Sequence, residues 1–205
     1  MSTIEKLYTL DKKPKINEIN LKLLIEYWIK YLQPFEIQYT LDDVESNVIS
    51  LRFPAENFAH LLGIETIAKR GGVKYQDLKS YRGQEAYNSI LANTLTFDSL
   101  KSLNSTIFKS VKDKFIYFYQ LPHLVVAAKE IINFTKVPGS YIECELLIYN
   151  AMHDVYVHLG LEKESSGQFY IPRTFLIERN LGTKYLDAQT EDKKRNILNI
   201  NKVTL

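Results

Sequence analysis

The sequence predicts an α+β protein, with a small antiparallel β-sheet flanked by several α-helices and a further helix at the N-terminus. Three observations support this fold class. Apolar residues recur at three- and four-residue spacing in several segments, as they do in amphipathic helices. Two other regions alternate apolar and polar residues, as half-buried strands do. The resulting order of helix, hairpin, helices and strands lacks the regular strand–helix alternation of a doubly wound sheet.

The first predicted element is a helix over residues 16–32. Its apolar side chains share one helical face, and Pro34 ends the pattern because proline cannot continue a helix. The preceding residues 1–15 are polar and contain Pro14, so we expect a loosely ordered lead-in.

A β-hairpin and a short helix follow. Residues 35–41 and 47–53 both alternate apolar and polar side chains, and an acidic turn separates them. Pro54 then opens a helix, since proline is tolerated in the first helical turn, and Gly63 marks its end.

The remaining elements are helices first and strands afterwards. Helical spacing predicts helices over residues 74–93, over residues 105–119 with Asn104 or Ser105 as cap, and over residues 123–134. Period-two alternation predicts antiparallel strands over residues 141–149, 155–161, 168–171 and 174–177.

A chain of 205 residues suffices for one compact core and is too short for two full-sized domains. We therefore expect a single domain over residues 1–205. Residues 1–44 would supply an N-terminal helical extension and the first strand, and residues 45–180 the core. Residues 181–205 would form a charged C-terminal tail.

The composition is that of an ordinary soluble globular protein, with 45% hydrophobic and 24% charged residues. The 26 basic and 24 acidic residues leave a net charge of +2, which excludes a broadly basic surface for nucleic acid. Any contact with a polyanion must come from local clusters. The 14 tyrosines supply both core bulk and polar hydroxyls.

Cysteine usage and hydropathy indicate a cytoplasmic protein with no membrane association. Cys144 is the single cysteine, so no disulfide forms within the chain, and we expect a reducing compartment. The N-terminal residues lack the apolar run of a signal peptide. No apolar run approaches the roughly 20 residues that span a bilayer.

Common cofactor and metal motifs are missing, so we expect neither a cofactor nor a metal. The sequence has no glycine-rich phosphate loop, no pair of cysteines for zinc and no nucleophile elbow. A metal cluster of His153, Asp154 and His158 is disfavoured, because strand residues five apart face opposite sides. Cys144 is interpreted as a buried structural thiol within a strand.

Two segments carry candidate site residues. In residues 51–64 a strand enters a short helix, and His60 falls at the polar edge, where an imidazole can act as general acid or base. In the later segment, Tyr170, Arg173 and Thr174 bring hydroxyls beside a guanidinium, which suits phosphate binding. The alternatives are a surface histidine and an ordinary strand with a proline-induced bulge.

Four short stretches of the sequence resemble the phage-associated nuclease-like family that is grouped with barnase, EndoU, colicin and RelE-type ribonucleases. They read R-F-P-A-E-N-F-A-H-L-L-G-I, L-A-N-T-L-T-F-D-S-L-K-S-L, F-K-S-V-K-D-K-F and Y-I-P-R-T-F. The resemblance covers roughly residues 45–180, which would form a nuclease-like core, and N-F-x-H-L-x-G is its most specific part.

The resemblance implies metal-independent cleavage of RNA by general acid–base chemistry. His60 matches the motif histidine and Thr174 the Ser or Thr of the late motif, and Tyr170 and Arg173 adjoin it. A cytoplasmic toxin or effector of a phage or mobile element is then expected. A second strong acid or base is not evident in the sequence.

Basic and aromatic residues form a candidate surface for substrate binding. Lys69 and Arg70 could hold RNA by phosphate contact together with Tyr81 and Arg82, and Arg52 is assigned to the same role. A solvated loop is the alternative for the first four residues.

Two other functions stay open. A non-catalytic module of the same fold would bind a protein partner, such as an antitoxin or a host factor, and inhibit or tune it. A nucleotide-processing transferase would instead hold a dinucleotide with its Tyr and Arg side chains.

Overall fold

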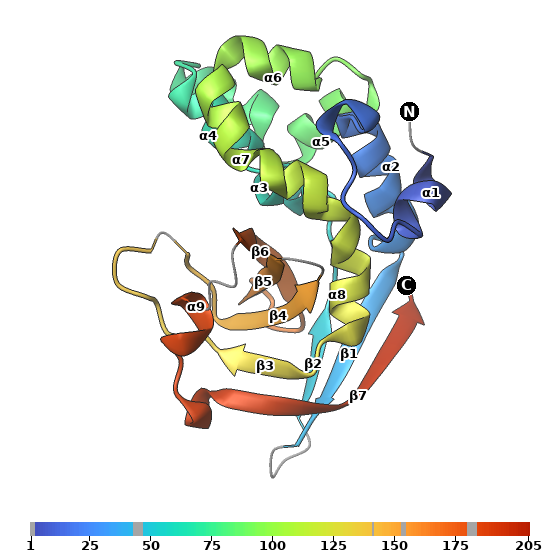
Figure 1. Cartoon of the computed structure of the whole chain (residues 1–205), viewed down its shortest axis with the longest axis vertical. Helices are drawn as coiled ribbons and strands as arrows, with labels where there is room; N and C mark the ends of the chain where they lie inside the picture. The colour runs from blue at the N-terminus through green and yellow to red at the C-terminus, as the bar shows by residue number, and fades with distance from the viewer. Residues whose placement is uncertain (1–2, 43–46, 141, 153–154, 180–183) are drawn as a thin grey trace. The chain divides into compact units, whose positions relative to one another are not determined.

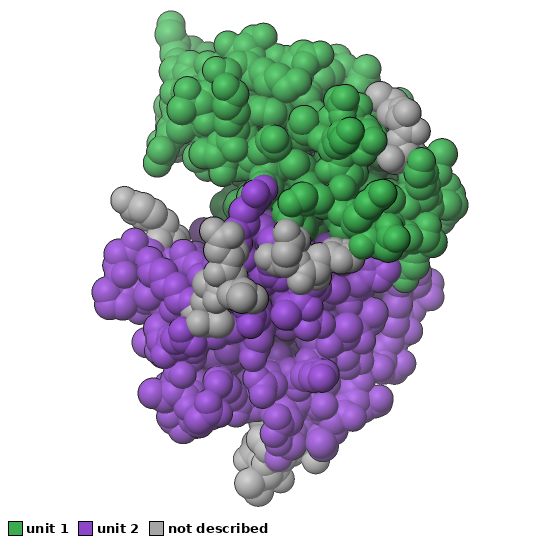
Figure 2. Space-filling view, viewed as in Figure 1, with its two compact units in different colours: residues 1–33, 54–119 green, residues 34–53, 120–205 purple. Residues whose placement is uncertain are grey.

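The computed structural model describes residues 3–42, 47–140, 142–152, 155–179 and 184–205 (Figure 1). The chain divides into two compact units (Figure 2). Residues 1–33 and 54–119 form the first, which we call the helical unit, and residues 34–53 and 120–205 form the second, the barrel unit. The hairpin segment therefore interrupts the helical unit in sequence.

The described elements of the helical unit are all helices. They are α1 (Ile4–Tyr8), η1 (Ile16–Glu18), α2 (Leu21–Tyr31), α3 (Asn57–Leu61), α4 (Ile64–Arg70), η2 (Tyr75–Tyr81), α5 (Gly83–Leu91), α6 (Phe97–Leu103) and α7 (Ser105–Tyr117). The short η3 (Phe118–Gln120) spans the boundary between the units. Aromatic rings fill the core of the helical unit: Trp28 lies 5.6 Å from Phe58 and 6.1 Å from Phe118 between ring centroids.

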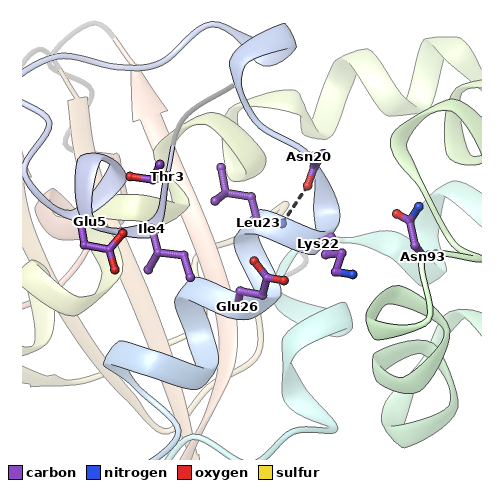
Figure 3. Close-up of a pocket in the computed structure, with 8 residues that line it drawn as sticks. All are labelled: Thr3, Ile4, Glu5, Asn20, Lys22, Leu23, Glu26 and Asn93. Carbon is purple, nitrogen blue, oxygen red and sulfur yellow. Dashed lines mark hydrogen bonds between the residues drawn. The ribbon is translucent and has the colours of Figure 1, made fainter.

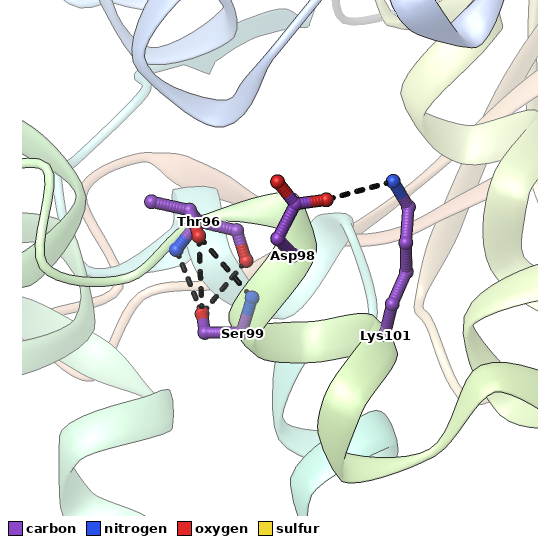
Figure 4. A network of polar contacts seen from close by, with 4 residues as sticks. All are labelled: Thr96, Asp98, Ser99 and Lys101. Carbon is purple, nitrogen blue, oxygen red and sulfur yellow. Dashed lines mark hydrogen bonds and ion pairs between the residues drawn. The ribbon is translucent and has the colours of Figure 1, made fainter.

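Capping side chains begin α6 and α7. Asn104 accepts a 2.9 Å hydrogen bond from the backbone N–H of Ile107, which confirms the cap predicted for α7. At α6, the backbone N–H of Ser99 donates to Thr96 Oγ1, and the Ser99 hydroxyl accepts from the backbone N–H of Thr96 (Figure 4). Lys101 pairs with Asp98 on the same helix.

Gly63 separates α3 from α4 in a left-handed backbone conformation, with φ of +72°. This conformation favours glycine because it has no Cβ. The helix end predicted near Gly63 is confirmed.

The barrel unit contains a closed barrel of seven strands. They are β1 (Phe35–Leu41), β2 (Val48–Leu51), β3 (Glu130–Asn133), β4 (Leu146–Met152), β5 (Val155–Lys163), β6 (Tyr170–Arg179) and β7 (Lys194–Thr204), together with α8 (Leu121–Ala127), α9 (Lys184–Asp187) and η4 (Glu191–Lys193). The strand order is β1-β2-β6-β5-β4-β3-β7, and β7 returns to β1. The β2–β6 pair is parallel and the other pairs are antiparallel.

The prediction of a small antiparallel sheet flanked by helices is therefore wrong. The predicted hairpin does form, with Ile37 opposite Leu51, but it joins the later strands in one barrel. The strand that was not predicted is β7, which lies in the segment expected to be a charged tail. Its mostly polar, solvent-exposed residues hide the strand pattern, and backbone pairing to both β1 and β3 stabilises it instead.

Helix predictions had mixed outcomes. The helix over residues 105–119 is confirmed as α7, and the main part of the helix over residues 16–32 is confirmed as α2. The helix over residues 123–134 is wrong beyond Ala127, since its β-branched residues Ile131 and Ile132 enter β3. In the described residues, no helix has the length and apolar character needed to cross a bilayer.

Barrel closure depends on a narrow seam between β2 and β6. The described register contains one pair across it, Leu51 opposite Tyr170. The backbone N–H of Arg52 adds a 3.0 Å hydrogen bond to the carbonyl of Tyr170. This seam brings together two sequence segments that lie over a hundred residues apart, and both carry predicted site residues.

Candidate functional site

The seam places the predicted residues Arg52 and Tyr170 next to each other. Arg52 directly follows β2, and Tyr170 is the first residue of β6. Their backbones are hydrogen-bonded, but the residue paired with Tyr170 is Leu51, so Arg52 and Tyr170 belong to alternate faces of the paired strands. The sequence nominated them on separate grounds, and the structure brings their backbones together at the seam.

Arg52 is held by two neighbours. Its Nε donates a 2.6 Å hydrogen bond to Oε2 of Glu36, and its guanidinium lies 4.5 Å from the ring centroid of Phe169. Glu36 is only 7% exposed, and its other oxygen accepts from Gln38 and Ser50. Hydrogen bonds from Gln38, and then from Arg52 and Ser50, lower the pKa of Glu36, so its carboxylate is ionised at neutral pH.

The Arg52 side chain nevertheless reaches solvent, with 40% of it exposed. Its two terminal nitrogens have no hydrogen-bond partner among the residues that the structure describes. A guanidinium held through Nε presents these nitrogens as a charged fork. Such a fork matches the oxygens of a phosphate group.

Tyr170 carries a hydroxyl on β6, the strand paired with β2. Burial raises its pKa above 10, and the charge of Glu145 adds to the rise while Arg195 opposes it. The phenol therefore stays protonated at neutral pH and can donate a hydrogen bond. The Lys163 ammonium lies 5.9 Å from the Tyr170 ring centroid and adds positive charge nearby.

Arg173 and Thr174 lie farther along β6. Arg173 Nε is 3.1 Å from Oε2 of Glu162, and both side chains are nearly half exposed, so this ion pair contributes little stability. Thr174 pairs with Gly160 of β5. A Cβ at position 160 would come within 2.9 Å of Cys144 and 3.3 Å of Thr174 Cβ, which explains the glycine.

Cys144 does not supply a reactive thiolate. Burial raises the pKa of its thiol to about 12, and the charge of Glu145 adds to the rise. At neutral pH the side chain is a neutral thiol, which is a poor nucleophile.

The other predicted residues belong to the helical unit. His60 is exposed on α3, and Lys69 and Arg70 are exposed in the last turn of α4. Tyr81 ends η2 and is half-buried, with Arg82 directly after it.

Arg82 contacts Tyr75, the first residue of η2. Its guanidinium lies 5.8 Å from the ring of Tyr75 and pairs with Glu65 at 3.2 Å. Tyr75 is 79% exposed, so a ring and a cation do reach solvent together at this position.

The predicted catalytic residues fall into both units. His60 lies in the helical unit, whereas Thr174, Tyr170 and Arg173 lie in the barrel unit. The use of His60 and Thr174 in one cleft therefore stays a prediction.

A pair that the sequence did not reveal involves His158 on β5. This residue is 1% exposed, and its Nε2 lies 3.0 Å from Oε2 of Glu178 on β6. The rings of Tyr149, Tyr156 and Tyr185 surround the imidazole at centroid distances of 6.2, 6.2 and 5.9 Å. Burial lowers the pKa of His158 to about 4, so the ring is neutral at pH 7.

Strand alternation alone could place His158 on a face of β5, but it could not show the register with β6 that brings Glu178 to it. His153 and Asp154, weighed as metal partners of His158, lie outside the described residues. Within the described part of the chain, no group of three His, Cys, Asp or Glu side chains could hold a metal ion.

Two adjoining surface pockets lie in the helical unit, and none of the predicted site residues lines them. One has a volume of about 460 Å³ and is lined by Thr3, Ile4, Glu5, Asn20, Lys22, Leu23, Glu26 and Asn93 (Figure 3). A second, of about 320 Å³, shares Asn20, Lys22 and Asn93. Glu5 and Glu26 line the first pocket together with Lys22, so it does not favour an anionic ligand.

Comparison with known families gave one match. The sequence matches the family described as "phage-Barnase-EndoU-ColicinE5/D-RelE like nuclease4" over residues 6–201. This confirms the resemblance seen in the short motifs and extends it to both units. No curated protein and no solved structure matches the chain significantly.

Proposed function

This chain belongs to the phage-Barnase-EndoU-ColicinE5/D-RelE like nuclease4 family, and we propose that it cleaves RNA by general acid–base chemistry without a metal ion. Membership indicates a phage-associated nuclease type that acts on nucleic acid. RNA as the substrate and a role as toxin or effector belong to the proposal.

The observation that carries the proposal is the seam between β2 and β6. There Arg52 presents its charged fork to solvent, and Tyr170 of the paired strand would add a protonated hydroxyl. Cleavage of RNA passes through a phosphorane whose extra negative charge needs such donors. Arg173 and Thr174 would supply a second cation and a second hydroxyl on β6.

His60 is the proposed proton carrier. Its imidazole would take the proton of the 2′-hydroxyl as the O2′–P bond forms. The imidazolium would then return a proton to O5′ as the P–O5′ bond breaks. The products are a 2′,3′-cyclic phosphate and a 5′-hydroxyl. His60 is exposed on α3, so a bound strand could reach its imidazole.

The test is cleavage of total RNA in EDTA by the full chain and its variants. We expect the wild type to cut and to leave cyclic phosphate ends, and we expect His60→Ala and Arg52→Ala to lose most activity. Lys136→Ala is the matched control, since Lys136 is an exposed cation of the barrel unit paired with Glu143 at 2.6 Å. It should keep wild-type activity.

The double variant His60→Ala/Arg52→Ala tests whether both residues serve one reaction. Groups that act as a unit are strongly non-additive, so the double variant should be little worse than the poorer single variant. Cutting that requires a metal, or full activity in His60→Ala, would contradict the mechanism. Absence of both cleavage and RNA affinity would contradict the proposal and favour a non-catalytic protein-binding module.

A further inference from the structure

Glu36 is an acidic residue whose side chain is almost buried. It lies on β1, and its side chain is only 10% exposed. A buried carboxylate costs free energy unless it is paired and hydrogen-bonded. Three side chains on the hairpin meet that need: Gln38 Nε2 at 2.7 Å, Ser50 Oγ at 3.1 Å and Arg52 Nε at 2.6 Å.

The hairpin register explains why these side chains meet. Gln38 lies opposite Ser50, and continuing the same antiparallel register puts Glu36 opposite Arg52. The alternate residues Ile37 and Leu51 are fully or almost fully buried in the core. The four polar side chains therefore share the other face of the hairpin.

The two carboxylate oxygens of Glu36 have separate partners. Oε1 accepts from Gln38 and Ser50, whereas Oε2 accepts from Arg52. Gln38 and Ser50 thereby restrict the rotation of the carboxylate, and Oε2 is directed at the Arg52 Nε. The guanidinium is restrained a second time by the ring of Phe169, 4.5 Å away.

A free arginine side chain has many accessible rotamers, and part of this rotamer entropy is lost on binding a ligand. The Glu36 and Phe169 contacts remove much of that freedom before a ligand arrives, which is how preorganisation strengthens binding. The two terminal nitrogens of Arg52 stay available, as described above.

We propose that Glu36 is a positioning residue that holds Arg52 as a fixed fork for one backbone phosphate of single-stranded RNA. The inference rests on the proposed function for the identity of the anion. The fork itself follows from the hydrogen bonds and the ring contact.

The test measures binding of a short 2′-O-methylated RNA, which cannot be cleaved, so the result does not depend on catalysis. The decisive variant is Glu36→Gln. If Glu36 were only a nearby acid, removal of its negative charge would strengthen RNA binding. The proposal predicts the opposite, a roughly fivefold weaker affinity, because Arg52 loses its anchor.

Glu143→Gln is the matched control. Glu143 is also ion-paired and lies in the barrel unit, but its side chain is 69% exposed and its partner is Lys136. We expect unchanged or slightly tighter RNA binding. Far-UV circular dichroism and the urea midpoint of each variant show whether it is folded, and Arg52→Lys gives a second approach. It keeps the charge and loses the fork, so it should also weaken binding.

A double-mutant cycle separates positioning from general stability. In an Arg52→Ala background, Glu36→Gln should weaken RNA binding no further. Tighter binding by Glu36→Gln alone, or equal weakening in both backgrounds, would overturn the proposal. Displacement of the RNA by micromolar inorganic phosphate would overturn the RNA backbone as the ligand. RNA binding that depends on Glu36, without any cleavage, would uphold this inference and refute the proposed activity.

Discussion

Two carboxylates of the barrel unit each hold a nitrogen-containing partner, yet the two pairs have different consequences. Glu36 holds Arg52 at 2.6 Å, and Glu178 holds His158 at 3.0 Å. The Arg52 side chain is 40% exposed, whereas the His158 side chain is 1% exposed. The first pair presents a charge to solvent, and the second encloses a neutral ring.

The surroundings of Glu178 show what the buried pair does. Its other oxygen accepts a 3.2 Å hydrogen bond from the backbone N–H of Lys184, at the start of α9. Tyr185 of the same helix packs edge-on against His158. The pair thus ties α9 to the barrel. The two pairs differ in the exposure of the nitrogen-containing partner. An exposed partner such as Arg52 is suited to binding a ligand, whereas a buried partner such as His158 stabilises the fold.

The largest expected effect concerns stability. His158→Ala removes a ring packed among three tyrosines and leaves a half-buried carboxylate oxygen of Glu178 without its donor. We expect a loss of about 3 kcal/mol in the free energy of unfolding. Urea denaturation at pH 7.5 measures it.

Arg52→Ala is the matched comparison, because it also removes the partner of a carboxylate. We expect it to cost less than about 1 kcal/mol, since the pair is partly exposed and screened by solvent. An equal loss of unfolding free energy in His158→Ala and Arg52→Ala would contradict the different roles of the two pairs.

A second prediction concerns pH. Burial lowers the pKa of His158 from 6.5 to about 4, so the unfolded chain takes up a proton between these values that the folded chain does not. Stability from this group is therefore complete above pH 6.5 and declines as the pH falls towards 4. Between pH 7 and pH 5 the loss is about 2 kcal/mol.

The Glu178 carboxyl acts in the opposite direction. Burial raises its pKa, so its contribution favours the fold at low pH and is lost as the pH rises through the folded-state value. The free energy of unfolding is measured against pH for wild type and for His158→Gln. The difference between the two curves gives the contribution of the histidine, because glutamine can still donate to Glu178 and does not titrate. Parallel pH profiles for the two proteins would refute the assignment.

The last prediction separates the two pairs by their effect on activity. On the proposed function, Arg52→Ala lowers kcat/KM for RNA about tenfold, which is about 1.4 kcal/mol. His158→Gln, assayed well below its unfolding temperature, should keep kcat/KM near the wild-type value. An activity loss in His158→Gln that equals the loss in Arg52→Ala would place the buried pair in the reaction.

Much of the helical unit could be predicted from local pattern. The apolar spacing of α2 and α7, the Asn104 cap and the glycine at position 63 all depend on residues within a few positions of one another. Such signals are visible in sequence because a helix forms its hydrogen bonds within itself. The β1–β2 hairpin is likewise local.

The candidate site was predictable as a set of residues and not as an arrangement. Arg52 and Tyr170 were nominated from separate motifs, and their adjacency depends on the single register pair across the seam. No sequence pattern indicated Glu36, because a glutamate on an alternating strand is expected to be an ordinary solvent-facing residue.

The sequence by itself determined several local elements and the family, and it nominated candidate site residues, because helical periodicity, turn residues and short motifs are properties of neighbouring positions. Tertiary structure alone decided that β7 closes a barrel, that Arg52 meets Tyr170 and Glu36, and that His158 is buried against Glu178. Strand partners and burial arise from hydrogen bonds and packing between distant segments. A polar strand such as β7 is recognisable only once its neighbours are in place.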